Sequence, residues 1–546
     1  MIRFAAAAFV AALLSAAPAQ AGRYAVGVRQ GASISDVSAA VERATGARVD
    51  PSLGKLGAVV VETSSARSLR GIPGVAYVER LGTRRLAFTP TDPLAAKQWH
   101  LDQDHATSFW PEFPALAGPK VAVIDSGIDG GHPEFAGRIA GARSFVGGNP
   151  LTDQQGHGTF VAGLIAAQTN NGVGVAGMAF GSQLLIAKVV RPSRQVALEA
   201  EAEAIRWAVD NGARVINLSL GGLRDPRDAT RDTYSPLEAA AIRYAYTRGV
   251  VVVAAVGNGD QSPTMPWPYA SYPAALPHVI GVGALSKDGA VPAFSNRDPI
   301  YNDLTAPGQE LVSTFPRQLT AQRPACDEQG YSICGPDEYR TAEGTSFAAP
   351  QVTAAAALLL SVRPLLRPDQ VAHLLTRSAD DLTAANGCKQ CPPLRDPYSG
   401  WGRLDVERAL ASLSGPLPAG DQFESNDNAG SQATPLRQRR ADFTATLDFW
   451  DDHVDVYKVF LRKRQRITIT LETPRRTDAD LLLWKPGTRQ VEGLSIALLR
   501  KRAAMSATRK AKERIAYRAK VPGWYYVEAK LVQPGDGAYR LAFVKR

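Results

Sequence analysis

The chain has 546 residues, which predicts three or four structural units at roughly 150 residues each and excludes a single small binding module. Hydrophobic residues make up 45% and charged residues 21% of the sequence, as in a globular protein rather than a disordered or collagen-like one. The net charge of +10 resides in residues 421–546, which hold 25 Lys and Arg against 15 Asp and Glu. A basic module can favour an anionic surface, although a solvated basic face is the usual explanation. No aromatic residues alternate with these charges, so we expect no nucleic acid partner.

The first 21 residues have the layout of a secretory signal peptide. Arg3 precedes an apolar run that ends near Leu14, and the small-residue sequence Ala19-Gln20-Ala21 follows. We therefore predict residues 1–21 as a signal peptide and expect export of the mature protein, to the extracellular space or the periplasm.

The four cysteines occur as two close pairs, which fits an oxidising compartment. Neither pair has the histidines or the second C-x-x-C of a zinc site, so we expect two local disulfides. Four cysteines allow three pairings, but short loops close more easily than one that spans both pairs. The predicted disulfide residues are Cys326, Cys334, Cys388 and Cys391.

Residues 22–88 form the first expected folded unit, of mixed α+β type. Strand-like runs at 24–28 and 58–62 flank a helical segment that starts after Ser35, and a turn and a further strand follow at 71–79. Residues 82–93 are polar, basic and contain proline, which indicates an exposed and cleavable connector.

Residues 93–415 form the second and largest unit, which we assign to the α/β class. Apolar β-branched runs at 120–125, 184–190, 214–220 and 250–256 are separated by Ala-rich helical segments, most clearly 199–211 and 237–248. This alternation predicts a parallel sheet with helices on both faces. In such folds, functional sites gather at the carboxyl ends of the strands.

Residues 416–420 are a Pro/Gly linker, and residues 421–546 form the last unit. Period-two alternation at 454–459, 466–471 and 524–528 predicts an antiparallel β-sandwich. The basic segment 503–520 departs from this alternation. Its composition is compatible with a helix, and we assign it only as an insertion or loop.

Three short motifs in the second unit together indicate nucleophilic serine chemistry. Asp125 ends an apolar strand, His157 stands between two glycines at the start of an apolar helix, and Ser346 opens an Ala-rich helix. Each feature alone has an ordinary structural explanation, such as a core histidine or a helix N-cap. Together they supply a hydroxyl, an imidazole to take its proton and a carboxylate to orient the imidazole.

The motifs V-I-D-S-G-I-D, G-H-G-T-x-V-A-G and G-T-S-x-A-A-P closely resemble the active-site motifs of subtilisin-like serine proteases, in the same order. The resemblance extends from about Leu94 to Leu410. It implies that Ser346 is the nucleophile, His157 the general base and then acid, and Asp125 its orienting carboxylate. It further implies that Asn258 donates its amide to the oxyanion, with the Ser346 N–H as second donor.

The same resemblance implies a substrate-binding strand at Ser219-Leu220-Gly221, which would pair with an extended polypeptide. Ala255, Val256 and Ser271 are the expected walls of the primary specificity pocket. We expect that pocket to be apolar with no acidic side chain at its floor, which argues against strict preference for Lys or Arg.

The chemistry needs no metal or other cofactor. His132 matches a family position near the first calcium-binding region, with Glu134 where many relatives carry Asp, and residues 170–177 resemble the calcium-loop segment of the family. The set of oxygen ligands is incomplete by motif, so the resemblance leaves a structural Ca²⁺ at Glu134 open.

The outer units also resemble parts of secreted peptidases. Residues 22–88 look like the inhibitory propeptide of subtilisin-like proteases, and residues 421–546 look like the β-sandwich found after bacterial peptidase domains. We therefore expect a monomeric, secreted serine endopeptidase that acts on polypeptides and is held inactive by its own propeptide. The basic last unit could also bring it to an anionic surface.

A second hypothesis is a binding or surface protein on the same scaffold, with proteolysis weak or absent. Non-catalytic relatives would be expected to lose at least one of the residues Asp125, His157, Asn258 and Ser346, and all four are present. A processing protease with few partners is not distinguished from a general endopeptidase by the sequence.

Overall fold

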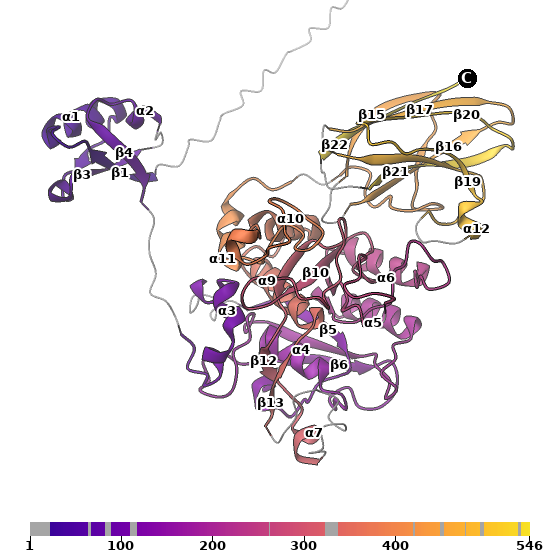
Figure 1. Ribbon diagram of the computed structural model, residues 1–546, viewed down its shortest axis with the longest axis horizontal. Coiled ribbons are helices and arrows are strands. Elements are labelled where there is room, and N and C mark those ends of the chain that lie inside the picture. Colours follow the sequence, from indigo (N-terminus) through magenta and orange to yellow (C-terminus); the bar gives the residue numbers. More distant parts are fainter. Residues whose placement is uncertain are drawn as a thin grey trace, which may run out of the picture. The chain divides into compact units, whose positions relative to one another are not determined.

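The computed structural model describes residues 22–63, 67–81, 89–109, 117–260, 262–322, 337–418, 421–447, 452–474, 477–491, 496–532 and 537–546 (Figure 1). The chain divides into two compact units, Met1–Leu86 and Ala87–Arg546.

The first unit is a four-stranded antiparallel sheet with helical segments beside it. Its strands are β1 (Gly22–Val28), β2 (Val49–Asp50), β3 (Ala58–Thr63) and β4 (Val75–Arg80), in the order β2-β3-β1-β4. Helix α1 (Ile34–Thr45) begins after Ser33, whose hydroxyl accepts a hydrogen bond from the Asp36 N–H, and α2 is Arg67–Arg70. Valines from β1, β3 and α1 share one buried cluster, so this unit has a core of its own.

The second unit is built around a sheet of seven parallel strands. Its spatial order is β11-β10-β9-β8-β5-β7-β6. The strands are β5 (Lys120–Asp125), β6 (Ile139–Ser144), β7 (Gln183–Lys188), β8 (Ala213–Leu218), β9 (Val251–Ala255), β10 (Val279–Leu285) and β11 (Leu304–Pro307). The expected parallel sheet is therefore present, and the four expected strands are its central members.

Helices cover both faces of this sheet, because successive strand residues point to opposite sides. In β5, Val121 and Val123 pack into the cluster that contains α4 (His157–Ala166) and α9 (Thr345–Val362). Ala122 and Ile124 pack into the cluster that contains α5 (Leu198–Asp210) and α6 (Pro236–Tyr246). Shorter elements complete this domain: α3 (Trp99–Gln103), the antiparallel pair β12 (Leu311–Thr314) and β13 (Tyr339–Ala342), α7 (Arg317–Gln322), α10 (Pro368–Ser378) and α11 (Val406–Ala411).

Helix α9 is the only helix in the described part of the chain that is long and apolar enough to cross a membrane. However, 83% of that window is buried inside the protein, and its residues pack on the central sheet. The helix is therefore part of the core, and its first turn lies at the carboxyl ends of the strands (Figure 1).

The C-terminal domain consists of two antiparallel-rich sheets. One has the order β14-β16-β21-β18-β19 and the other β15-β22-β17-β20. The strands are β14 (Thr434–Leu436), β15 (Arg440–Leu447), β16 (Val454–Leu461), β17 (Arg466–Glu472), β18 (Ala479–Trp484), β19 (Arg502–Ser506), β20 (Lys512–Arg518), β21 (Gly523–Leu531) and β22 (Gly537–Lys545), with one short helix, α12 (Ile496–Leu499). The two sheets fit the expected sandwich.

The expectation of an insertion or loop at residues 503–520 was wrong, because this segment forms β19 and β20. In β20, Glu513 and Ile515 are buried while Lys512 and Arg514 are exposed, which is the period of a strand. The whole of β20 pairs with β17, so tertiary pairing overrides the helix propensity of its Lys and Arg residues.

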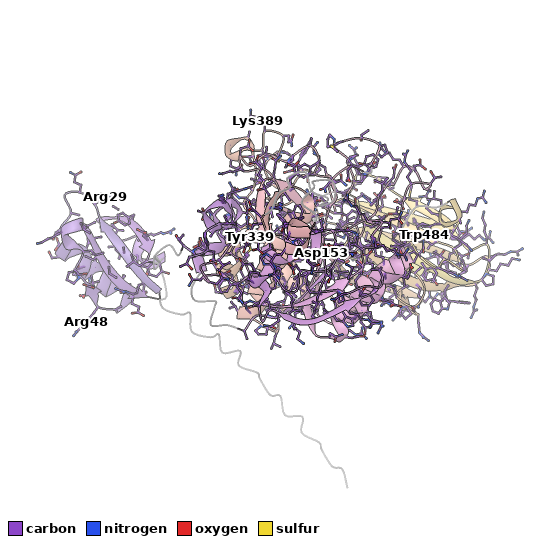
Figure 2. The ribbon with its side chains drawn as sticks, turned by 90° about the horizontal axis from the view of Figure 1, so that it is seen from below. Arg29, Arg48, Asp153, Tyr339, Lys389 and Trp484 are labelled. Atoms are coloured by element: carbon purple, nitrogen blue, oxygen red, sulfur yellow. A yellow bond between two sulfur atoms is a disulfide. The ribbon has the colours of Figure 1, made fainter. Side chains whose placement is uncertain are left out.

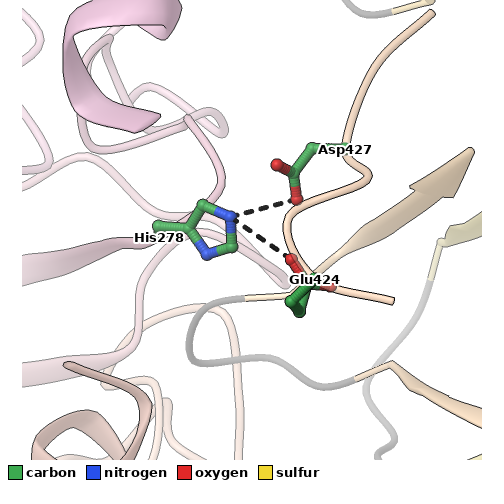
Figure 3. Close-up of side chains that lie close together, drawn as sticks. All are labelled: His278, Glu424 and Asp427. Atoms are coloured by element: carbon green, nitrogen blue, oxygen red, sulfur yellow. Dashed lines mark ion pairs between the residues drawn. The ribbon is translucent and has the colours of Figure 1, made fainter. Parts of the chain in front are cut away.

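One buried cluster joins the domain of the parallel sheet to the C-terminal domain (Figure 3). His278 lies just before β10, and its Nε2 is 3.1 Å from Asp427 Oδ1 and 3.7 Å from Glu424 Oε2. Tyr246 at the end of α6 stacks on the His278 ring, with centroids 3.6 Å apart. The C-terminal domain thus contacts the domain of the parallel sheet at the amino-terminal end of β10, opposite to the carboxyl edge of that sheet.

Candidate active site

Asp125 and His157 form a hydrogen-bonded pair at the carboxyl edge of the sheet. Asp125 is the last residue of β5 and is buried, and His157 is the first residue of α4. His157 Nδ1 lies 2.9 Å from each Asp125 carboxylate oxygen. This contact assigns the proton to Nδ1 and leaves Nε2 as the acceptor.

Glycine is required beside this pair because the backbones approach closely. A Cβ at Gly158 would lie 2.2 Å from the Gly127 carbonyl oxygen and 3.1 Å from the Asp125 Cβ. No side chain larger than hydrogen fits there, which explains the second glycine of the G-H-G motif.

The pKa of His157 is raised above its usual value. Burial disfavours the imidazolium, but the charge and hydrogen bond of Asp125 and the charge of Asp153 outweigh that effect. The side chain is still 31% exposed, so its free nitrogen can be reached from the cleft.

Ser346 is the second residue of α9, and its main chain and side chain are both bonded to Ser219. The Ser346 hydroxyl donates to the Ser219 carbonyl at 3.3 Å, and the Ser219 hydroxyl donates to the Ser346 carbonyl at 2.6 Å. The Ser346 N–H belongs to the first turn of α9, where backbone donors have no partner within the helix. It is therefore available to an oxygen in the cleft.

Asn258 follows β9, and Thr345 sets the orientation of its amide. Its Oδ1 accepts hydrogen bonds from the Thr345 N–H at 2.9 Å and from the Thr345 hydroxyl at 2.8 Å. With the carbonyl side occupied, the Nδ2 donors are directed away from Thr345. Gly344 next to it has a φ of 145° and leaves room for the amide, since a Cβ there would lie 3.2 Å from Nδ2.

One cleft of about 750 Å³ is lined by Asp125, His157, Asn258 and Ser346. The Ser219–Gly221 segment forms part of the wall of this cleft, and the segment Val190–Ala197 faces the same cavity. The structure therefore brings Asp125, His157, Asn258 and Ser346 together with the expected substrate strand.

A smaller pocket of about 170 Å³ adjoins Ser346 and Asn258. Ala255 and Ser271 both line it, whereas Val256 is fully buried and does not. The expectation of an apolar pocket was wrong, because Asp260 also lines it and is the only charged residue that does so among the described residues. Asp260 lies just beyond the Gly257-Asn258-Gly259 turn, where the sequence alone did not show which way the chain continues.

Glu134 is held in the structure by three hydrogen-bond donors of the protein. Its side chain is fully buried, and its Oε1 accepts hydrogen bonds from the Val175 N–H at 3.0 Å and the Tyr339 hydroxyl at 3.1 Å. Its Oε2 accepts one from Asn171 Nδ2 at 3.2 Å, and burial raises its pKa to about 7. The carboxylate thus fastens the 170–177 segment directly through protein donors.

Two clusters among the described residues have ligand atoms close enough together to hold a metal ion, and neither lines the cleft. They are His278 with Glu424 and Asp427, and Asp421 with Asp452 and Asp455. The Sγ atoms of Cys388 and Cys391 lie at bonding distance. The predicted disulfide residues Cys326 and Cys334 lie outside the described residues, as do the predicted signal peptide and most of the connector after residue 81.

The comparisons with known proteins agree with this geometry. The subtilase family model matches residues 117–396, about half of the chain. The chain is 35% identical over 298 residues to the thermophilic serine proteinase of Bacillus sp. (strain AK1), which covers 54% of this chain and 65% of the relative. It is 33% identical over 278 residues to thermitase of Thermoactinomyces vulgaris, covering 50% of this chain and 86% of the relative. It is 36% identical over 294 residues to subtilisin DY of Bacillus licheniformis, covering 54% and 91%. The chain therefore belongs to the subtilase family and is a subtilisin-like serine endopeptidase.

Proposed function

We propose that this endopeptidase is exported, is made as a self-inhibited precursor, and cleaves polypeptides with Asp125, His157 and Ser346. The observation that carries the proposal is the convergence of the Asp125–His157 pair, the Ser346 hydroxyl and the oriented Asn258 amide on one cleft.

In the acylation step, Ser346 Oγ attacks the scissile carbonyl carbon while His157 Nε2 takes the hydroxyl proton. The negative charge that develops on the carbonyl oxygen is stabilised by Asn258 Nδ2 and the Ser346 N–H. His157 then gives its proton to the amine nitrogen, and the C–N bond breaks to leave an ester on Ser346. Water repeats the sequence in deacylation, with His157 first taking and then returning a proton. The Ser346 hydroxyl must leave the Ser219 carbonyl to enter this cycle.

The substrate backbone pairs with Ser219–Gly221. Gly221 lies so close to the Tyr272 carbonyl oxygen that a Cβ would be 2.4 Å from it, and Gly222 exchanges two backbone hydrogen bonds of 2.9 Å with Tyr272. One edge of the segment is thus occupied by protein, while its cleft side is open to an extended polypeptide.

The small pocket beside Ser346 takes a side chain with a polar or basic end. Asp260 supports this preference because a carboxylate in the pocket wall attracts a Lys or Arg side chain. Asp260→Asn should lower kcat/KM more for a peptide with arginine in this pocket than for the same peptide with leucine there. Equal losses for the two peptides would refute the preference.

The outer parts of the chain serve secretion and control. Residues 1–21 direct export, and residues 22–88 inhibit the peptidase until the connector is cut. The separate core of the first unit supports an independently folded inhibitor. The basic excess of residues 421–546 supports a role for the C-terminal domain in holding the enzyme at an anionic surface.

The first experiment is fluorophosphonate labelling of the secreted, matured protein and of Ser346→Ala, with casein hydrolysis measured in parallel. Labelling and hydrolysis in the parent, both abolished in Ser346→Ala, are expected. A folded and processed parent that shows neither would refute the proposal.

A further inference from the structure

A buried carboxylate, Asp153, lies in the loop that leads into α4 and is outside the set of catalytic motifs (Figure 2). Its Oδ1 accepts hydrogen bonds from the Gln155 N–H at 3.0 Å and the Gly156 N–H at 2.9 Å. Its Oδ2 accepts from the Thr159 N–H at 3.0 Å and the Thr159 hydroxyl at 2.7 Å. The carboxylate thus holds both the loop before His157 and the first turn of the helix that begins with it.

The same carboxylate reaches the other half of the catalytic pair through Ser126. The Ser126 hydroxyl donates to Asp153 Oδ1 at 2.9 Å, and it accepts the Gly158 N–H at 2.9 Å. Ser126 directly follows Asp125, and its own N–H donates to Asp125 Oδ1 at 2.7 Å. A hydroxyl has one proton, so the carboxylate at position 153 dictates that Ser126 accepts from α4 rather than donating elsewhere.

The charge of Asp153 is not neutralised by a direct ion pair among the described residues. Lys188 interacts with Asp153 electrostatically, but its ammonium donates its two hydrogen bonds of 2.9 Å to the carbonyl oxygens of Ser126 and Thr152. Besides Asp125, the other charged residues that line the cleft with His157 are Arg191, Arg194 and Glu343, which are all exposed. Water and salt screen those three far more than the buried Asp153.

We propose that Asp153 is the positioning residue of the catalytic pair: it locks the start of α4 onto the Asp125 turn and adds a second buried negative charge that favours the imidazolium of His157. This inference rests on the proposed triad. The charge of Asp153 also contributes to the raised pKa of His157. A misplacement of the imidazole by about 1 Å can cost on the order of 10²-fold in rate, so the fastening has a direct effect on turnover.

The test compares Asp153→Asn and Ser126→Ala with the parent, using peptide hydrolysis across pH. Fluorophosphonate titration counts active sites in each preparation, so incomplete folding or maturation does not enter kcat. Asp153→Asn should lower kcat about 10- to 100-fold with little change in KM. It should also move the acid limb of kcat/KM down by about 0.5 to 1 pH unit, because a buried negative charge is lost near His157. Ser126→Ala removes the hydroxyl that connects Asp153 to the Gly158 N–H but keeps the charge of Asp153. It should therefore lower kcat without shifting the acid limb of the kcat/KM profile.

Asp396→Asn is the matched control. Asp396 is also buried and also accepts hydrogen bonds from the N–H groups two and three residues later and from a serine hydroxyl, but it lines neither pocket beside Ser346. This control should lower thermal stability and leave the acid limb in place.

An acid limb in Asp153→Asn that coincides with that of the parent would overturn the inference, as would an unchanged kcat. Failure of the proposed triad is a distinct result, because the parent itself would then neither label nor hydrolyse peptides.

Discussion

Asn258→Ala tests whether the oriented amide stabilises the transition state. In the structure, Thr345 occupies the carbonyl side of this amide through two hydrogen bonds, so the Nδ2 donors have one fixed direction. Loss of a donor of this kind removes about 2.7 to 4 kcal/mol of transition-state stabilisation. We therefore expect kcat to fall by about 10²- to 10³-fold, with KM nearly unchanged because the substrate carbonyl gains its charge only in the transition state.

Thr345→Val tests the orientation of the Asn258 amide while the amide itself stays in place. Valine matches the shape of threonine but lacks the hydroxyl that holds Asn258 Oδ1 at 2.8 Å, while the backbone N–H contact at 2.9 Å remains. One neutral hydrogen bond contributes about 0.5 to 1.5 kcal/mol, so kcat should fall by about 2- to 13-fold.

The assay is hydrolysis of a peptide anilide by titrated active sites, with kcat and KM determined separately. Thermal unfolding of each variant is the control for folding. Two results would refute the reasoning: a folded Asn258→Ala enzyme with nearly the parent kcat, or a Thr345→Val enzyme that loses as much as Asn258→Ala.

Three further predictions follow from titratable side chains. The rate should fall on acidification as His157 is protonated, starting above the usual histidine range because the pKa of His157 is raised; a flat profile of kcat/KM through that range would contradict this. Burial raises the pKa of Glu201 and Glu238, and the two carboxyls face each other from α5 and α6, so the folded protein holds protons that the unfolded chain releases. Stability is therefore lost as the pH rises through the folded-state values, and Glu201→Gln in an inactive Ser346→Ala background should flatten that loss in urea unfolding. His278→Ala removes the ring 3.1 Å from Asp427, so limited proteolysis should separate the C-terminal domain faster than in the parent.

The sequence was sufficient to predict the parallel sheet and the residues that meet at its edge. Asp125 ends a run of five residues in which every side chain is buried, and such a run is readable without knowledge of its neighbours. Ser346 stands at the start of an 18-residue apolar helix, which fixes the direction of its backbone donors. Both features are local, and the resemblance then assigned their roles.

Segment 503–520 shows where local features are insufficient. Its Lys, Arg and Ala residues have good helix propensity, yet residues 512–518 pair along their whole length with β17, and Ile515 lies opposite Ile469. The partner strand is about 45 residues away in sequence, and burial of Ile515 depends on that pairing. Only the tertiary structure supplies the choice between helix and strand here.

Asp153 illustrates the same limit within the active site. It stands four residues before His157 in an ordinary polar loop. The sequence there would read the same whether this aspartate were buried or exposed. Its importance arises because β5 and α4 bring Ser126, Gly156 and Thr159 around one carboxylate. Asp260 was likewise not predictable from the sequence, because only the path of the chain after Asn258 places it in the pocket wall. Residues that perform chemistry are fixed by type and can be read from motifs, whereas residues that orient or select act through distances that a single sequence does not contain.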